Sequence, residues 1–378
     1  MPNLIEKYFT SKPVQAYFNT IKRFLPDEQS TSAIGLDIST IECKLVELKK
    51  SKNSYELIKW VIEPIHNGDI KATIQKIISK LETPPNSLYT SVFGKGTLIR
   101  YIDMPKMSLD DLKSSFSIEA DKYFPFAQNQ IYTDCCILDI NEKGKTMSVM
   151  AAATKKELVD RRTKLLEDLE MPVEFIGLNP IALANVLNVL GLEEGDDENT
   201  ESKESGENKG SKDKTKSSVI ALFDMGESVS SLTILVGKFP RFTRDIFIGG
   251  RDFTKSISNA LGISFKEAEE LKRVPGKKVK DVLGACETII MNMIQELRLS
   301  MDYFTTEKNQ EIEKLLLTGG TSLLNGIVES FEKNLEIKVC KWNPLSAITM
   351  GPNAPTENMD INSVKLGVAL GLALYQYD

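Results

Sequence analysis

One pattern occurs twice in this chain and restricts the folds it can adopt. A strand that ends in an acidic turn and continues into a second strand appears as IGLDIST–ECKLVEL and again as ALFDMGES–SLTILVG. Such a duplication predicts two similar lobes that face each other across a cleft. Each lobe would place one carboxylate, Asp37 or Asp224, at that cleft. The chain has 378 residues, which also favours two or more domains over a single core.

The two acidic turns suit the chemistry of a polyphosphate ligand. A triphosphate needs backbone N–H donors at close range and a divalent cation to offset its charge. Asp37 and Asp224 would hold a magnesium ion, mostly through its water molecules. Donors would come from small or hydroxyl residues in the turns, namely Ser39, Thr40, Gly226 and Ser228. One such turn is commonplace, so the prediction of a phosphate site depends on the presence of two.

A third element strengthens this interpretation. In LTGGTSLLNG, Gly319 and Gly320 follow a buried strand and precede a helix, where missing side chains let a flat ligand approach the backbone. The simpler explanation is a tight turn that requires positive φ. Glu269 and Lys272 lie three residues apart on a predicted helix and share one face. They form either a surface ion pair or a contact for a ribose. The stripe Ile289, Met293, Leu297 and Met301 is typical of a helix core.

Composition excludes several classes of function. The net charge of −6 gives no electrostatic case for nucleic acid as a partner. The single histidine, His66, lies in a loop-like stretch, which excludes the usual histidine-based zinc sites and triads. Five cysteines without a metal-type spacing indicate a reducing compartment. No apolar run approaches the ~20 residues that span a bilayer, so we expect a cytoplasmic protein.

Two segments stand apart from the rest. Residues 1–27 carry apolar residues at helical spacing, flanked by lysines, and predict a helix that docks on the protein or touches a membrane surface. Residues 193–217 contain no aromatic or aliphatic side chain, so they cannot bury surface to offset the entropy of ordering. We expect a disordered insertion there.

With these residues in place, the chain resembles one family. LDIST–ECKLVEL, FDMGES–SLTILVG and LTGGTSLLNGI are similar, in order, to the two phosphate loops and the adenosine loop of actin-like ATPases. The stretches DMPKMSLDDLKSSFSIEADKYFPF, RFTRDIFIGGRDFTKSI and LRLSMDYF resemble the PilM family of type IV pilus assembly proteins in particular. The resemblance covers the chain from about Ala33 onward, except for the insertion.

The resemblance implies an α/β, actin-like (ribonuclease H-like) fold of two domains with a nucleotide cleft between them. It implies an N-terminal helical segment at 1–30 and a first domain at 31–95 that is completed by 176–192 and 350–378. A small α+β subdomain would be inserted at 96–175, and the second domain would span 218–349. ATP and Mg²⁺ would occupy the cleft, with further nucleotide contacts from Lys44 and Thr321.

The resemblance also implies a setting. A groove on the first domain would hold the cytoplasmic N-terminal peptide of a PilN-like single-span inner-membrane protein. Other pilus platform proteins and motor ATPases are further partners that the family suggests. The chain would lie in the cytoplasm, peripheral to the inner membrane, with membrane contact that is indirect or made through residues 1–27.

Several positions depart from the family and bear on the mechanism. Ser39 replaces a glycine of the first phosphate loop, and Glu42 and Glu227 stand where small neutral residues are usual. A carboxylate repels a triphosphate unless it faces away or binds the metal. Asn179 and Gly177 replace acidic residues before the first connecting helix, and asparagine cannot accept a proton from water. We therefore expect ATP binding with slow or no hydrolysis.

Two other functions remain open on the same fold. An active ATPase or a sugar-kinase-like phosphotransferase would need another carboxylate in the cleft to act as the general base, because Asn179 cannot accept a proton. An FtsA-like division or filament protein would end in a basic amphipathic membrane helix. This chain ends instead in GVALGLALYQYD, which predicts a packed helix of the first domain.

Overall fold

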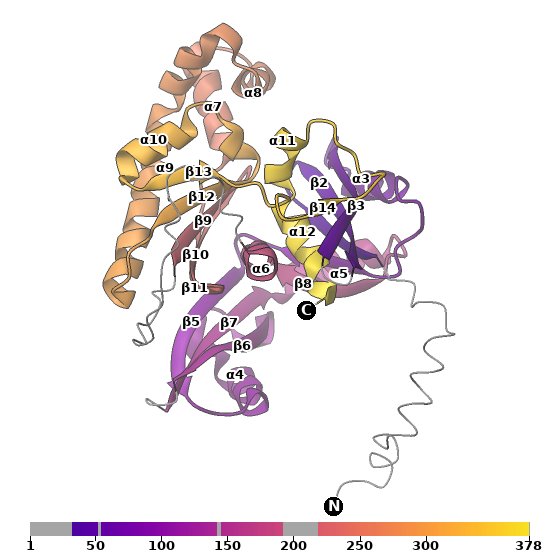
Figure 1. Ribbon diagram of the computed structural model, residues 1–378, viewed down its shortest axis with the longest axis vertical. Helices are drawn as coiled ribbons and strands as arrows, with labels where there is room; N and C mark the ends of the chain where they lie inside the picture. Colours follow the sequence, from indigo (N-terminus) through magenta and orange to yellow (C-terminus); the bar gives the residue numbers. More distant parts are fainter. Residues whose placement is uncertain (1–31, 52–53, 142–144, 192–217, 378) are drawn as a thin grey trace, which may run out of the picture.

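A computed structural model describes residues 32–51, 54–141, 145–191 and 218–377. The helix predicted over residues 1–27 and the insertion predicted over 193–217 lie outside the described residues. The described chain forms three sheets with helices packed on them (Figure 1).

The first lobe is built on a six-stranded sheet. Its strands run in the order β14 (Thr349–Met350), β3 (Ser54–Pro64), β2 (Glu42–Ser51), β1 (Ala33–Ile38), β4 (Leu88–Val92) and β8 (Val173–Leu178). One face packs on α3 (Ile70–Ile78) and α5 (Lys156–Glu167) through a core that includes Leu36, Ile74 and Leu166. The other face is covered by α6 (Asn179–Leu190) and α12 (Gly367–Leu374).

The second lobe repeats this plan. Its sheet has the order β11 (Phe239–Ile246), β10 (Ser230–Val236), β9 (Val219–Met225), β12 (Lys314–Thr318) and β13 (Lys338–Lys341). In both lobes an antiparallel β-meander is followed by two parallel strands that begin beside its first strand. The order β11-β10-β9-β12-β13 thus repeats β3-β2-β1-β4-β8. This equivalence confirms the duplication predicted from the two acidic turns.

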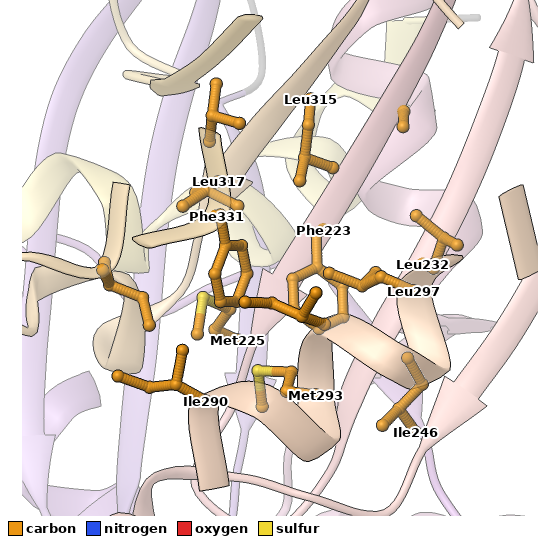
Figure 2. Close-up of a cluster of buried hydrophobic side chains, with 14 of the residues drawn as sticks. Phe223, Met225, Leu232, Ile246, Ile290, Met293, Leu297, Leu315, Leu317 and Phe331 are labelled. Atoms are coloured by element: carbon orange, nitrogen blue, oxygen red, sulfur yellow. The ribbon is translucent and has the colours of Figure 1, made fainter. Parts of the chain in front are cut away.

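Four helices share a core with one face of the second sheet: α7 (Gly250–Leu261), α8 (Phe265–Arg273), α9 (Val279–Lys308) and α10 (Ile327–Leu335). Figure 2 shows Met293 and Leu297 of α9 packed against Phe223 of β9, with Phe331 of α10 beside them. Met293 and Leu297 are fully buried, so the apolar stripe predicted on this helix belongs to the core. Strand alternation turns Phe223 and Met225 into this core and leaves Asp224 on the opposite face.

The third sheet belongs to the inserted subdomain. It has the order β5 (Thr97–Pro105), β7 (Thr146–Lys155) and β6 (Ile131–Asn141), and α4 (Leu109–Tyr123) packs on it. Ser108 caps α4, because its side chain accepts a hydrogen bond from the backbone N–H of Asp111. The boundary expected between 175 and 176 falls inside β8, whose pairing with β4 already begins at Val173.

The subdomain also touches the second lobe. Tyr101 of β5 and Thr243 of β11 share a hydrogen bond of 2.8 Å between their hydroxyl oxygens. Arg241 lies 3.8 Å from Asp139 of β6. The edge strands β5 and β11 therefore lie side by side (Figure 1), and the subdomain bridges the two lobes.

Helix α12 approaches its neighbours closely because two glycines permit it. A Cβ atom at Gly35 of β1 would lie 1.9 Å from the carbonyl oxygen of Ala369. One at Gly371 would lie 1.7 Å from the carbonyl oxygen of Ala182 in α6. No side chain fits at these distances. The backbone contact fixes β1, and with it the turn that follows Asp37.

Candidate functional site

A cavity of about 460 Å³ lies between the two lobes. Every residue predicted from the sequence for the nucleotide, the metal or the catalytic position lines it: Asp37, Ser39, Thr40, Lys44, Asn179, Asp224, Gly226, Ser228, Glu269, Lys272, Gly319, Gly320 and Thr321. These residues come from five separate parts of the chain. The fold brings them together without exception.

The first turn holds a buried ion pair. Asp37 and Lys44 face each other across β1 and β2, and the Lys44 ammonium lies 2.9 Å from Asp37 Oδ2. Both residues are less than a tenth exposed. Asp37 Oδ1 is also buried and has no hydrogen-bond partner among the described residues. An unpaired buried carboxylate oxygen is costly, and at this position it is available to a metal ion or to its water.

Ser39 serves the turn itself. Its backbone N–H and its hydroxyl both donate to the carbonyl oxygen of Glu42, at 3.1 and 2.7 Å. In this conformation neither group points to a ligand, so the donor role predicted for Ser39 requires the turn to change. Thr40 at the tip shares a 3.2 Å hydrogen bond with Ser228 of the second turn. The two turns therefore touch directly across the cavity.

The second turn is supported from the glycine junction. The carbonyl oxygen of Gly226 accepts hydrogen bonds from the Thr321 hydroxyl and from the Gly250 N–H, both at 2.9 Å. Thr321 thus positions the turn. Gly319 has φ of +83°, and a Cβ there would lie 2.4 Å from Asp224 Oδ1. The tight-turn explanation of this glycine is confirmed, and the approach of a flat ligand to its backbone stays a prediction. Residues Gly320–Leu323 then form a 3-10 turn, and α10 begins only at Ile327.

Asp224 is the second carboxylate of the cavity, and its charge is poorly compensated by its surroundings. Burial raises its pKa to about 6, nearby Asp37 adds to this, and Lys44 acts in the opposite direction. Burial alone would lower the pKa of Lys44, but Asp37 and Glu42 raise it above its usual value. The site therefore contains a strongly held ammonium, that of Lys44, and a carboxylate, that of Asp224, for which the described residues provide no ion pair.

Glu269 and Lys272 form an ion pair that is more buried than expected. The Lys272 ammonium lies 2.7 Å from Glu269 Oε2 and donates to Thr254 Oγ1 and the Gly250 carbonyl oxygen at 2.7 and 2.9 Å. Arg273 reaches the other carboxylate oxygen at 2.8 Å. These bonds tie α8 to the start of α7. The pair is structural in this conformation and still lines the cavity.

Asn179 begins α6 and faces the cavity. Its Oδ1 accepts a 2.7 Å hydrogen bond from the Ser91 hydroxyl of β4, which leaves the amide NH₂ as the group able to meet a ligand or water. An amide can orient water but cannot take its proton. Glu227 also lines the cavity, and burial raises the pKa of its carboxyl.

Two cationic residues that support the site were not predicted. Arg162 of α5 donates to the Ile38 carbonyl oxygen at 3.2 Å and to Thr90 Oγ1 at 3.1 Å, which braces the end of β1. Burial lowers its pKa to about 10. Lys365 lines the cavity from a 3-10 turn, Ser363–Lys365, and lies 3.4 Å from Glu42 Oε2. A single lysine before the apolar run GVALGLAL is the sequence signal that could have identified it.

The site fits a magnesium polyphosphate. Asp37 Oδ1 lacks a partner among the described residues, Asp224 carries a raised pKa, and the missing side chain of Gly319 lets that carboxylate lie against the glycine backbone. Within the described ranges, no group of three or more acidic, histidine or cysteine side chains gathers as a metal site. Two carboxylates suit Mg²⁺, which keeps several of its waters and is completed by substrate phosphates.

Two α/β lobes of equal topology with a cavity between their acidic turns define an actin-like protein, which confirms the predicted fold class. The chain belongs to the type IV pilus assembly protein PilM family, whose sequence model matches residues 35–377.

Solved structures agree with this fold. The chain is similar to a structure titled as the PilM-PilN type IV pilus biogenesis complex, with 24% identity and a TM-score of 0.76 over 92% of this chain and 99% of that one. It also resembles the ethanolamine utilization protein EutJ from Carboxydothermus hydrogenoformans, with 13% identity and a TM-score of 0.52 over 93% and 91% of the two chains. In the described part of the chain, no helix combines the length and the apolar character needed to cross a membrane.

Proposed function

We propose that this member of the PilM family is a cytoplasmic actin-like scaffold. It binds ATP with Mg²⁺ between its lobes, hydrolyses it slowly or not at all, and recruits the cytoplasmic N-terminus of a PilN-like membrane protein to the pilus assembly platform at the inner membrane. The observation that carries the nucleotide half is the convergence of all predicted site residues on one cavity. Membership in the PilM family and similarity to the structure of a PilM-PilN complex support the proposal of a PilN-like partner.

Within this site, Asp37 and Asp224 would hold the metal, and that ion would neutralise phosphate charge. Lys44 pairs with Asp37 and also acts by charge on Asp224, and it would face the same phosphates. The hydroxyls of Thr40 and Ser228, which bond to each other, would separate and turn to the ligand. The low polarity around Asp224 strengthens such charge interactions.

ATP with Mg²⁺ is expected to stabilise the protein against thermal unfolding. At a ligand concentration one hundred times the dissociation constant, the gain is about 2.7 kcal/mol, which differential scanning fluorimetry detects readily. Phosphate release measured on the same sample should not exceed that of an Asp224→Ala variant. No thermal shift at millimolar ATP and Mg²⁺ would contradict the proposal. Turnover that a Glu227→Gln variant abolishes would favour the enzyme alternative, with Glu227 in the role that Asn179 cannot perform.

We propose a second hollow as the binding site of the partner peptide. It lies between β6 and α5 and is lined by Tyr132, Val159, Asp160, Thr163, Lys164, Glu167 and Asp168. Strand β6 is an edge of its sheet, so its outer backbone groups can pair with an extended peptide. Tyr132 is 48% exposed and its hydroxyl donates to Asp160 at 3.1 Å. An exposed aromatic ring beside an edge strand could pack on an apolar side chain of an extended peptide.

Replacing Tyr132 with alanine is therefore expected to weaken binding of a peptide from the PilN-like cytoplasmic N-terminus by about tenfold, or ~1.4 kcal/mol. Fluorescence anisotropy with a labelled peptide measures the change. Tyr303→Ala is the matched control, since Tyr303 is another exposed tyrosine, 59% accessible, on α9 of the second lobe. Equal losses in both variants would argue against this groove. Absence of binding at millimolar peptide would argue against the partner itself.

A further inference from the structure

Four charged side chains form a continuous line along one wall of the cavity. Lys365 Nζ lies 3.4 Å from Glu42 Oε2, and Lys44 Nζ lies 3.6 Å from Glu42 Oε1 and 2.9 Å from Asp37 Oδ2. The charges alternate, so the line as a whole is neutral. All four side chains are at most 18% exposed. The Glu42 carboxylate therefore neither faces away from the cleft nor is free to bind a metal, because it pairs with the ammonium groups of Lys44 and Lys365.

Lys365 connects parts of the site that are distant in sequence. Its 3-10 turn is bound to the glycine junction, since Gly319 N–H and the Thr318 hydroxyl both donate to the Val364 carbonyl oxygen, at 2.8 and 2.7 Å. The Lys365 stem passes Gly320, where a Cβ would lie 3.7 Å from Lys365 Cε. The ammonium then ends at Glu42 in the first turn. Lys365 therefore crosses the cavity wall from the glycine junction to the first acidic turn.

The two contacts of Glu42 are the looser ones in the cavity. They measure 3.4 and 3.6 Å, whereas Lys44 with Asp37 and Lys272 with Glu269 measure 2.9 and 2.7 Å. Charge-assisted hydrogen bonds of good geometry lie near 2.7–2.9 Å. Glu42 therefore attracts its two lysines electrostatically but at distances longer than a well-formed hydrogen bond. A phosphate group offers more negative charge and more acceptor oxygens than a carboxylate. It can replace Glu42 as their partner.

We propose that Lys365 is a phosphate-binding residue of the cleft and that Glu42 is a built-in competitor for it. Without a ligand, the Glu42 carboxylate supplies Lys365 and Lys44 with the negative charge that a ligand phosphate would otherwise supply. A nucleoside polyphosphate takes over Lys365 and part of Lys44, and Glu42 is left as a repulsive neighbour that lowers affinity. This inference rests on the nucleotide binding proposed above and goes beyond it, because it assigns opposite effects to two residues of one ion pair.

The experiment is a double-mutant cycle on ATP affinity with Mg²⁺, measured by isothermal titration calorimetry. Glu42→Gln is expected to tighten binding about five- to tenfold, and Lys365→Met to weaken it by a similar factor. The Lys365→Met loss should be larger in the Glu42→Gln background, where the lysine is released from its carboxylate. Lys365→Arg should stay near wild type. Affinity for adenosine, which lacks phosphates, should not change in any variant.

Lys49→Met is the matched control. It removes the same charge from an exposed lysine at the far end of β2 and should leave ATP affinity unaltered. Thermal unfolding without nucleotide shows whether each variant is folded. If wild type binds ATP while Glu42→Gln and Lys365→Met bind it equally well, this inference is overturned and nucleotide binding stands. If wild type binds no ATP, both fail together.

Discussion

Replacing Lys44 with methionine is expected to lower the free energy of unfolding by about 3 kcal/mol. The change removes the cation 2.9 Å from Asp37 and leaves that carboxylate, 3% exposed, buried without its partner. The second oxygen of Asp37 already lacks a hydrogen bond among the described residues, so after the change only the more distant charge of Arg162 would act on this carboxylate. Urea unfolding of the ligand-free protein, followed by far-UV circular dichroism, measures the effect as a shift of the first-lobe transition.

Two further variants make this prediction specific. Asp168 pairs with Lys71 at 2.6 Å, but both side chains are about half exposed, so Lys71→Met should destabilise the protein far less than Lys44→Met. The double variant Asp37→Asn with Lys44→Met carries no buried charge at this position and should recover most of the loss. A double variant as unstable as Lys44→Met alone would show that packing of the lysine stem, and not charge compensation, is what Lys44 supplies.

Replacing Asp224 with asparagine is expected to weaken binding of ATP with Mg²⁺ at least about 100-fold, or ~2.7 kcal/mol. The amide keeps the shape of the side chain but removes the charge that would attract the metal. Calorimetric titration against wild type measures this loss. Because Asp224 would act through the metal, ATP without Mg²⁺ should bind the variant at least as tightly as wild type, since the amide removes a carboxylate that repels phosphate. Equal affinities with Mg²⁺ would remove Asp224 from the metal site.

Asp224→Asn weakens ATP binding but is expected to raise the free energy of unfolding, and this gain depends on pH. The pKa of Asp224 is raised to about 6 by burial, so the folded state binds a proton more tightly than the unfolded chain, whose Asp pKa is near ~3.9. Stability from this group is present below pH ~4 and is lost as pH rises through about 6, by roughly 3 kcal/mol. Asp224→Asn does not titrate. It should therefore gain stability relative to wild type between pH 5 and pH 7, as measured by thermal unfolding without nucleotide.

Local sequence patterns determined much of this architecture and most of the cavity lining. A strand followed by Asp37 or Asp224 fixes the edge of the sheet at which each carboxylate lies, because strand direction and alternation decide where the turn goes. Gly319 was identifiable because positive φ and a close backbone approach both demand glycine. In both cases a short stretch of residues contains the physical cause.

Other parts of the site depend on contacts between distant segments. Glu42 meets Lys365 across 323 positions, and Ser91 meets Asn179 across 88. No local pattern specifies such pairs, so the sequence indicated a repulsive Glu42 but not its two lysines. The donor groups of Ser39 were likewise predicted to face a ligand, whereas the turn uses them internally. Side-chain rotamers in turns follow from the folded surroundings.

The backbone contact of α12 with β1 and α6 also sets an order of events during synthesis. The ribosome makes α12 after every other element of the first lobe, yet β1 and α6 need it to cover their apolar faces. The second lobe is contiguous from β9 to β13 and can become compact before the first lobe closes. The cleft between them is then among the last features to mature. A nascent chain halted before Gly367 would present that uncovered face to chaperones and proteases.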